Sequence, residues 1–407
     1  MEQEPDLAEE LRWDAAVVDL IRRTQLAQPD ELVAELNAAV RPLGIAVTVY
    51  LVDHEQEQLW PLPERGKPTP PALSIDGSLA GRCFTGVRTY ASRDDIEPYR
   101  LWVPMVDGSE RLGIAEVVAQ RPPADAESFR RRCETLMGLL GHLVAVKSPY
   151  GDSLHRVRRT RPMSPAAELM LHLLPPLTFS CHRMVISAVL EPCYDVGGDA
   201  YDYAVDDQIA RFMVFDAMGR GLKAGLTCTA ALAATRAARR DGRDLSAMAR
   251  AADAALQEQF ADLRFVTGVL AELDLDTGVL RYLNAGHPPP ILLRQGKAVR
   301  ALRGGRRLPL GIEDDGFEVG AEVLEPGDRL LLYTDGITEA YDRSGERFGL
   351  DRLTDLATQG MNALLPAPET LRRLAHTVLE HQGGRPSDDA TLMIVEWSAD
   401  AAERTQP

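Results

Sequence analysis

The sequence predicts an α+β protein whose second half is a layered sandwich of β-sheet and helices. In that half, short apolar runs alternate with turn residues, which is typical of antiparallel strands. Longer segments with helical spacing of apolar residues lie between the runs. Antiparallel strands with interposed helices favour a two-layer or four-layer arrangement. At 407 residues the chain exceeds one typical domain, so about two or three domains are expected.

The first half is predicted to form an α+β unit of ordinary domain size. Apolar spacing indicates its helices, Pro29-Asp30 marks a helix start, and Asp107-Gly108 marks a turn between two apolar runs. In chain order we expect helices at 11–21 and 31–40, strands at 45–52, 101–106 and 112–118, and a helix at 127–146.

A change of composition between residues 147 and 165 predicts the domain boundary. Pro149 and Gly151 interrupt the helical pattern, and a basic stretch follows at 156–161. The expected division is a first domain at 1–148, a linker with a helix at 149–175, a second domain at 176–398 and a frayed tail at 399–407.

The second half is predicted to alternate strands with helices. Pro175-Pro176 ends a short helix, and Asp276-Thr277-Gly278 between two apolar runs is a hairpin signature. The expected strands are 184–190, 209–215, 265–275, 279–283, 291–294, 317–323, 329–333 and 391–397, and the expected helices are 165–174, 221–240, 245–260 and 369–381.

Composition excludes several classes of function. The formal net charge of −16 repels nucleic acid phosphates, so no nucleic-acid partner is expected. No apolar run approaches the ~18 residues of a membrane span, and the acidic start of the chain is unlike a secretory signal, so we expect a cytoplasmic protein without a membrane partner. Five cysteines without a Cys-x-x-Cys pair argue against a disulfide framework and a structural zinc site.

Four acidic segments of the second half form the candidate site. Each places an aspartate beside glycine or a small residue, next to an apolar run predicted as a strand. Carboxylates gathered from separate strand ends are typical ligands of Mg²⁺ and Mn²⁺. The segments are Val196-Gly197-Gly198-Asp199, Phe215-Asp216-Ala217-Met218-Gly219, Tyr333-Thr334-Asp335-Gly336 and Ser387-Asp388-Asp389-Ala390-Thr391.

Each segment also has another interpretation when it is taken alone. Asp216 could cap the following helix, Asp335 could belong to a turn, and Asp199 could be a solvated carboxylate at a bulge. The adjacent acids at 388–389 could be a charged strand entry. Diguanylate cyclases also carry a Gly-Gly-acid pattern, but Ala200 stands where their second acid would be, which weakens that alternative.

Taken in order, the motifs resemble those of the SpoIIE-type serine/threonine phosphatases, bacterial relatives of the type 2C, metal-dependent (PPM) protein phosphatases. The resemblance covers about residues 165–397. It implies a central β-sandwich flanked by helices, with two Mn²⁺ or Mg²⁺ ions at one end. The motifs are Leu173-Leu174-Pro175, Val196 to Asp202, Asp216-x-x-Gly219-x-Gly221, Asn284 to Pro289, Leu330 to Ala340 and Asp388 to Leu392.

The resemblance also implies roles for single residues. Asp216 would bridge both metals, and the Ala217 carbonyl would bind one of them. Asp335 and Asp388 would hold the other ion, and Asp199 would bind directly or through water. Asp216 and Asp335 are therefore the expected catalytic residues. The implied reaction is hydrolysis of phosphoserine or phosphothreonine on a phosphorylated protein, with an anti-sigma-factor antagonist as the implied substrate.

Four further residues lie near the motifs. His287 could be a general acid or part of a structural loop, and the structural interpretation is favoured because no partner is evident. Arg220 and Lys223 could face a phosphate or be a solvated helix start. Asp389 is left out of the predicted ligand set.

Residues 1–148 resemble a GAF domain through 77–84, 101–108 and 111–117. The resemblance implies a sensor that binds a small ligand or dimerises, and a packing module without a ligand is the alternative. We expect a homodimer in which the sensor orients the linker helix and thereby controls the phosphatase. A catalytically idle scaffold is the second hypothesis, and the aspartates at all four expected ligand positions count against it.

Overall fold

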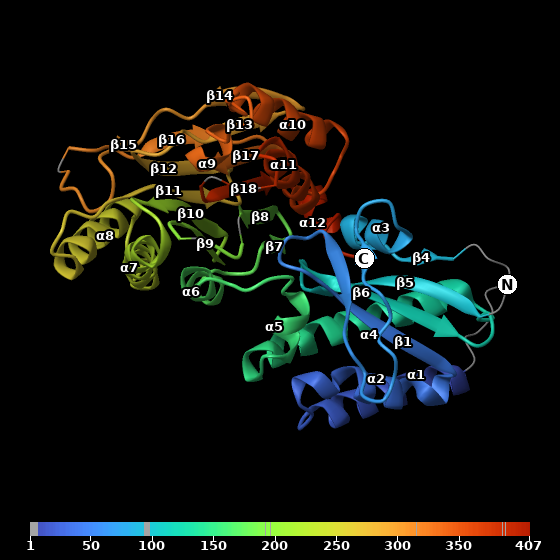
Figure 1. Ribbon diagram of the computed structural model, residues 1–407. Helices are drawn as coiled ribbons and strands as arrows, with labels where there is room; N and C mark the ends of the chain where they lie inside the picture. The colour runs from blue at the N-terminus through green and yellow to red at the C-terminus, as the bar shows by residue number, and fades with distance from the viewer. Residues whose placement is uncertain are drawn as a thin grey trace. The chain divides into compact units, whose positions relative to one another are not determined.

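The computed structural model describes residues 7–92, 98–191, 193–195, 197–314, 316–384, 386 and 388–407. The chain divides into two compact units, Met1–Thr160 with Arg404–Pro407 and Arg161–Glu403 (Figure 1). Each unit combines helices with a largely antiparallel sheet structure, so the α+β prediction is confirmed. Across the described ranges, no helix combines the length and apolarity needed to cross a bilayer.

The N-terminal unit is a six-stranded antiparallel sheet with helices on both faces, in the strand order β3-β2-β1-β6-β5-β4. Leu20, Leu36 and Leu140 bring three helices onto one face, and Phe84 brings a shorter helix onto the other. The elements are α1 (Leu7–Thr24), α2 (Leu32–Val40), β1 (Ile45–Val52), β2 (Gln58–Pro61), β3 (Leu73–Ser74), α3 (Leu79–Gly86), β4 (Tyr90–Ala91), β5 (Tyr99–Asp107), β6 (Glu110–Ala119), α4 (Ala126–Lys147) and α5 (Ser153–Arg158).

The C-terminal unit contains two six-stranded sheets. The first has the order β15-β12-β11-β10-β9, with β16 also paired to β12, and the second has the order β14-β13-β17-β18-β8-β7. The strands of the first sheet are β9 (Asp199–Asp206), β10 (Ile209–Ala217), β11 (Val266–Asp274), β12 (Val279–Ala285), β15 (Arg306–Arg307) and β16 (Gly320–Val323). Those of the second are β7 (Thr178–Cys181), β8 (Met184–Glu191), β13 (Ile291–Arg294), β14 (Lys297–Ala301), β17 (Asp328–Tyr333) and β18 (Ala390–Trp397).

The two sheets pack face to face and helices cover both outer sides, which gives four layers (Figure 1). Side chains alternate between the faces of a strand. On β10, Phe212 and Val214 join the core between the sheets, whereas Met213 and Phe215 join the core under the helices. The helices on that side are α6 (Pro165–Leu173), α7 (Gly221–Arg240) and α8 (Leu245–Gln259), and those on the other are α9 (Asp335–Thr338), α10 (Leu350–Asn362), α11 (Ala367–His381) and α12 (Ala399–Glu403).

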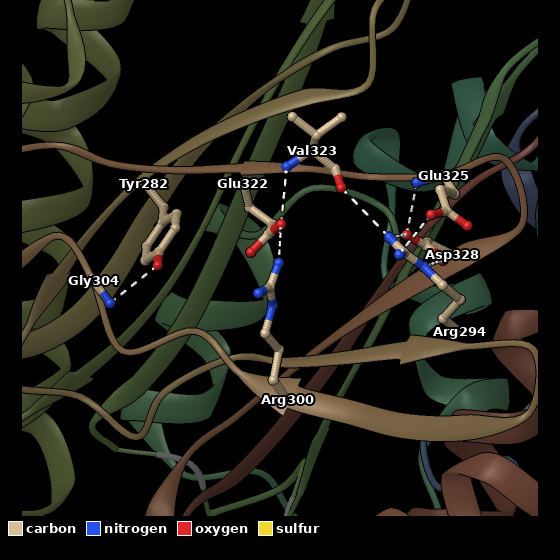
Figure 2. A network of polar contacts seen from close by, with 8 residues as sticks. All are labelled: Tyr282, Arg294, Arg300, Gly304, Glu322, Val323, Glu325 and Asp328. Atoms are coloured by element: carbon tan, nitrogen blue, oxygen red, sulfur yellow. Dashed lines mark hydrogen bonds and ion pairs between the residues drawn. The ribbon is translucent and has the colours of Figure 1, made fainter.

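Polar side chains connect the two sheets at the end where β17 begins (Figure 2). The guanidinium of Arg294, at the end of β13, donates to both carboxylate oxygens of Asp328 at 2.9 and 2.7 Å, and pairs with Glu325 at 2.7 Å. Arg300 of β14 pairs with Glu322 of β16, which belongs to the first sheet. These contacts hold the end of β17 that is opposite to Asp335.

Candidate functional site

Antiparallel pairing places the first two aspartates side by side. β9 begins at Asp199 and β10 carries Asp216 near its end, and the register pairs these two residues directly. Asp216 lies within the strand, and α7 is preceded by Arg220 at its N-cap position, so Asp216 does not cap the helix. Asp199 is only 1% exposed, which excludes the interpretation of a solvated carboxylate at a bulge.

Two threonines connect Asp199 to the second sheet. The hydroxyl groups of Thr334 and Thr391 donate to the same oxygen of Asp199 at 2.7 and 2.8 Å. The backbone N–H of Thr391 donates in turn to the Thr334 hydroxyl at 2.8 Å. Thr334 directly precedes Asp335, and Thr391 follows the acids at 388–389. The four acidic segments therefore meet at one end of the sandwich.

The glycines of these segments allow the backbones to approach closely. A Cβ atom on Gly336 would lie 1.9 Å from the carbonyl oxygen of Asp389, and one on Gly197 would lie 2.3 Å from the backbone nitrogen of Gly221. Any larger residue would separate the segments. The site geometry therefore requires glycine at these two positions, because a side chain would collide with the neighbouring segment.

Asp389 has a role that the sequence did not reveal. Its carboxylate accepts hydrogen bonds from the backbone N–H groups of Gly197 and Gly198 at 2.9 and 2.6 Å. It thereby positions the turn that leads into Asp199. Its partners are backbone amides, which nearly every residue has, so no residue type in the sequence indicates these bonds. The partners also lie 191 and 192 residues away along the chain. Val196 and Ser387, which belong to the predicted motifs, lie outside the described residues.

Burial and mutual repulsion oppose ionisation of the clustered carboxyl groups. Burial, and after it the neighbouring carboxylates, raises the pKa of Asp216 to about 7. Burial, followed by the charge of Asp216, raises the pKa of Asp199 well above its usual value. Burial also raises the pKa of Asp335 and of Asp389. A bound cation would relieve this repulsion, since opposite charge favours the ionised form.

The donor set fits a hard divalent cation. The carboxylates of Asp199, Asp216, Asp335 and Asp388, with the Ala217 carbonyl, offer oxygen atoms only, which suits Mg²⁺ or Mn²⁺. Within the part of the chain that the structure describes, no three acidic, imidazole or thiol groups converge on a common point. Asp388 pairs with the guanidinium of Arg220 at 3.0 Å instead. The individual ligand roles therefore stay predictions. The carboxylate side chains would have to rotate toward one another to bind a shared ion.

His287 is a buried residue of the loop after β12. Its ring Nδ1 lies 2.9 Å from the hydroxyl of Thr267, and its backbone N–H donates to Asn284 at 2.8 Å. Thr267 is the neighbour of Asp216 on the adjacent strand. Burial lowers the pKa of His287 to about 4, so the ring is neutral near pH 7 and a poor proton donor. These contacts favour the structural interpretation of this histidine.

We expect His287→Gln to reduce the turnover of p-nitrophenyl phosphate less than about tenfold, because a general acid typically contributes about 10²–10⁴-fold. Turnover should be followed across the neutral pH range, with thermal unfolding as a control for the fold. A loss of about 10²-fold in a folded variant, with a changed pH profile, would show that His287 is a general acid after all.

A cavity of about 440 Å³ lies within the N-terminal unit. Its walls combine aromatic and charged side chains, among them Trp13, Phe129, Arg12 and Arg121. Pockets of this size with a few polar groups commonly hold small molecules. The GAF-like assignment and ligand binding by this unit remain predictions.

The family match lies within the C-terminal unit. The family model of Stage II sporulation protein E (SpoIIE) matches residues 206–398. The chain is 24% identical over 213 residues to the phosphoserine phosphatase RsbU of Bacillus subtilis (strain 168), which covers 52% of this chain and 62% of RsbU. It is 25% identical over 210 residues to the phosphoserine phosphatase RsbP of the same organism, covering 50% of this chain and 49% of RsbP.

Among solved structures, the SiaA-PP2C domain of Pseudomonas aeruginosa aligns with 62% of this chain and 99% of that domain, with 25% identity and a TM-score of 0.49. The chain spans less than two thirds of the length of RsbU and about half of RsbP.

Proposed function

The C-terminal unit is a SpoIIE-type domain of the PPM phosphatase family, and on that premise we propose that the protein is a metal-dependent phosphatase acting on phosphoserine or phosphothreonine of a regulatory protein. The family match confirms the SpoIIE-type resemblance, and the motifs from Asp216 onward lie within the matched residues. Two relatives are named phosphoserine phosphatases, which supports this substrate class for the present chain.

One observation carries the proposal. Asp199 is paired with Asp216 in the first sheet and is hydrogen-bonded to Thr334 and Thr391 of the second. This arrangement holds acidic segments from distant parts of the chain at one sandwich end, where their carboxylates repel one another. Such a concentration of like charge opposes stability and is therefore expected where a cation binds.

We propose that Asp216, the Ala217 carbonyl, Asp335, Asp388 and Asp199 hold two Mg²⁺ or Mn²⁺ ions. Two such ions would lower the pKa of a shared water and neutralise charge on the phosphoryl oxygens. The chain's own part is to orient these ligands: two threonine hydroxyls fix Asp199, and Asp389 fixes the turn before it.

A cysteine nucleophile has no support in the structure. Cys83, Cys133, Cys193 and Cys228 are buried, and burial raises the pKa of Cys228 well above its usual value. A thiol must ionise to attack a phosphorus centre, so the raised pKa values of Cys83, Cys133 and Cys228 make these three groups poor nucleophiles. Direct attack by water is consequently the pathway that we favour.

The predicted domain organisation is the basis of our proposal for how the phosphatase is regulated. The expected substrate is the phosphorylated antagonist of an anti-sigma factor. The GAF-like unit would act as the sensor, and the cavity between its first helix and its sheet supports a small ligand there. A homodimer that transmits the signal through the linker helix, and a cytoplasmic location, remain part of the proposal.

The direct test is the metal dependence of turnover. We expect the full chain to hydrolyse p-nitrophenyl phosphate with Mn²⁺ and to lose that activity in excess EDTA, with recovery when Mn²⁺ is restored. Mn²⁺ should also raise the melting temperature, because a ligand that binds only the folded state stabilises it by mass action.

Two results would contradict the proposal. Turnover that persists in EDTA would exclude the metal-dependent mechanism. A chain that binds Mn²⁺, as judged by its melting temperature, yet hydrolyses neither p-nitrophenyl phosphate nor a phosphoserine peptide would favour the idle scaffold. The melting measurement separates this second outcome from a simple failure to bind metal.

A further inference from the structure

Helix α7 presents an uncharged face to solvent within the C-terminal unit. It lies between α6 and α8 in the outer helical layer (Figure 1). From Ala224 to Thr235 the helix has no charged residue. Leu222 and Leu226, one turn apart, are 50% and 46% exposed, and the exposed stripe continues along the helix through Ala233 and Ala237. A surface helix normally carries charged residues on this side.

A third exposed leucine lies near the start of this helix. Leu263, in the loop before β11, is 68% exposed. Its neighbour Arg264 approaches the loop before α7, with a guanidinium nitrogen 3.9 Å from the position that a Cβ of Gly219 would take. The backbone of Met218 also donates to the carbonyl of Phe265 at 3.1 Å. The loop that carries Leu263 therefore packs against the loop that leads into α7, at the carboxylate end of the sandwich.

Two cations stand at the same end. Arg220, which is 70% exposed and pairs with Asp388, immediately precedes α7, and Lys223 is exposed on its first turn. The chain as a whole carries a net charge of −16, so a phosphate-bearing partner is repelled by most of the surface and attracted only where cations gather. This charge pattern, and the position of Leu222 two residues after the Arg220 that pairs with Asp388, favour a phosphoprotein over other occupants.

We propose that the exposed face of α7, together with Leu263, docks apolar residues that flank the phosphorylated residue of a protein substrate, while Arg220 and Lys223 attract the phosphoryl group. The inference rests on the proposed phosphatase function. From Leu222 to Ala237 the stripe spans about 22 Å, the length of about seven extended residues. The substrate would thus be recognised by a short apolar stretch beside the phosphorylated residue.

The test compares three probes on the full chain with Mn²⁺. They are p-nitrophenyl phosphate, a phosphoserine peptide with leucines within about seven residues of the phosphoserine, and the same peptide with serines in their place. We expect wild-type kcat/KM to favour the leucine peptide about tenfold over the serine peptide, since each partly exposed leucine can still bury apolar area. The double variant Leu222→Ser/Leu226→Ser should lose that preference through KM and keep its turnover of p-nitrophenyl phosphate.

Val299→Ser on β14 is the matched control, because Val299 is 50% exposed and lies on the edge of the other sheet. It should leave the preference intact. Suppose that the wild type turns over p-nitrophenyl phosphate but hydrolyses the two peptides equally well, or hydrolyses neither peptide. That result would overturn the docking proposal and leave the phosphatase proposal intact. A wild type without p-nitrophenyl phosphate turnover would overturn both proposals. A change in molecular mass of the double variant by light scattering would assign the face to contact between copies and would also overturn the proposal.

Discussion

Asp216→Asn is expected to reduce Mn²⁺-dependent hydrolysis of p-nitrophenyl phosphate by about 10³-fold or more. The amide has nearly the same shape but no negative charge, so the proposed bridge between two cations is lost. A loss of about 4 kcal/mol in transition-state stabilisation corresponds to that factor, and metal ions commonly supply several kcal/mol. Turnover should be measured across a Mn²⁺ titration, since weaker binding alone would be recovered at high Mn²⁺.

The same substitution is expected to stabilise the metal-free fold at higher pH. The pKa of Asp216 is raised to about 7 in the folded protein from 3.8, so ionisation disfavours the folded state relative to the unfolded chain. This contribution to stability is fully present below about pH 4 and is lost as the pH rises toward 7. In EDTA, the melting temperature of Asp216→Asn should therefore fall less between about pH 5 and pH 8 than that of the wild type.

Asp262→Asn is the matched control for both measurements. Its carboxylate is 62% exposed and pairs with Arg264 outside the acidic cluster. Neither the Mn²⁺ dependence nor the stability in EDTA should change appreciably. If Mn²⁺ raised the melting temperature of Asp216→Asn as much as that of the wild type, Asp216 would not be a metal ligand.

Asp253→Ala should have the largest effect on stability. The carboxylate of Asp253 on α8 accepts hydrogen bonds from Arg307 at 2.8 and 3.0 Å and from the backbone of Gly311 at 2.8 Å. The Arg307 side chain has no exposed surface and also stacks on Phe317, 4.8 Å from the ring centre. Removing the partner of a buried charge costs about 3–5 kcal/mol. The melting temperature should therefore fall on the order of 10 °C.

Two further variants distinguish the loss of an ion pair from other causes. The double variant Asp253→Leu/Arg307→Met should recover part of the stability, because a buried pair can be replaced by apolar residues at lower cost than one charge alone. Asp276→Ala, which removes an exposed pair with Arg183, should cost less than about 1 kcal/mol. If Asp253→Ala melted like the wild type, solvent would have to reach Arg307 in the folded protein.

Strong local patterns were sufficient to predict much of the fold. The runs that became β1 and β13 were placed at their observed bounds, because continuous apolar residues leave little choice of structure. Strand β9 was not predicted, since acidic residues interrupt its apolar pattern. The buried carboxylate of Asp202 pairs with Arg236 and Arg239 of α7 at 2.7 and 2.8 Å. These arginines lie more than thirty residues away in the chain, so a short sequence segment does not show that the charge of Asp202 is neutralised.

Other elements were missed because their signals are weak. β3, β4 and β15 contain two residues each, too few for a period of two to be recognised. β14 is an exposed edge strand whose Lys297 and Arg300 are typical of a protected sheet edge. Helix α10 is amphipathic and was also missed, although its buried Leu353 and Ala357 lie one turn apart. Only the neighbouring elements decide whether such segments pack as a strand, helix or loop.

The sequence by itself determined which aspartates are candidate ligands, because carboxylates beside glycine at strand ends follow a local rule of residue type and spacing. Those four segments were ambiguous one at a time, and their order along the chain indicated the family. Only the tertiary structure decided that Asp199 is buried and tied to both sheets through Thr334 and Thr391. It likewise decided that Asp389 positions the turn before Asp199. These roles depend on contacts between residues more than a hundred positions apart, which local spacing does not encode.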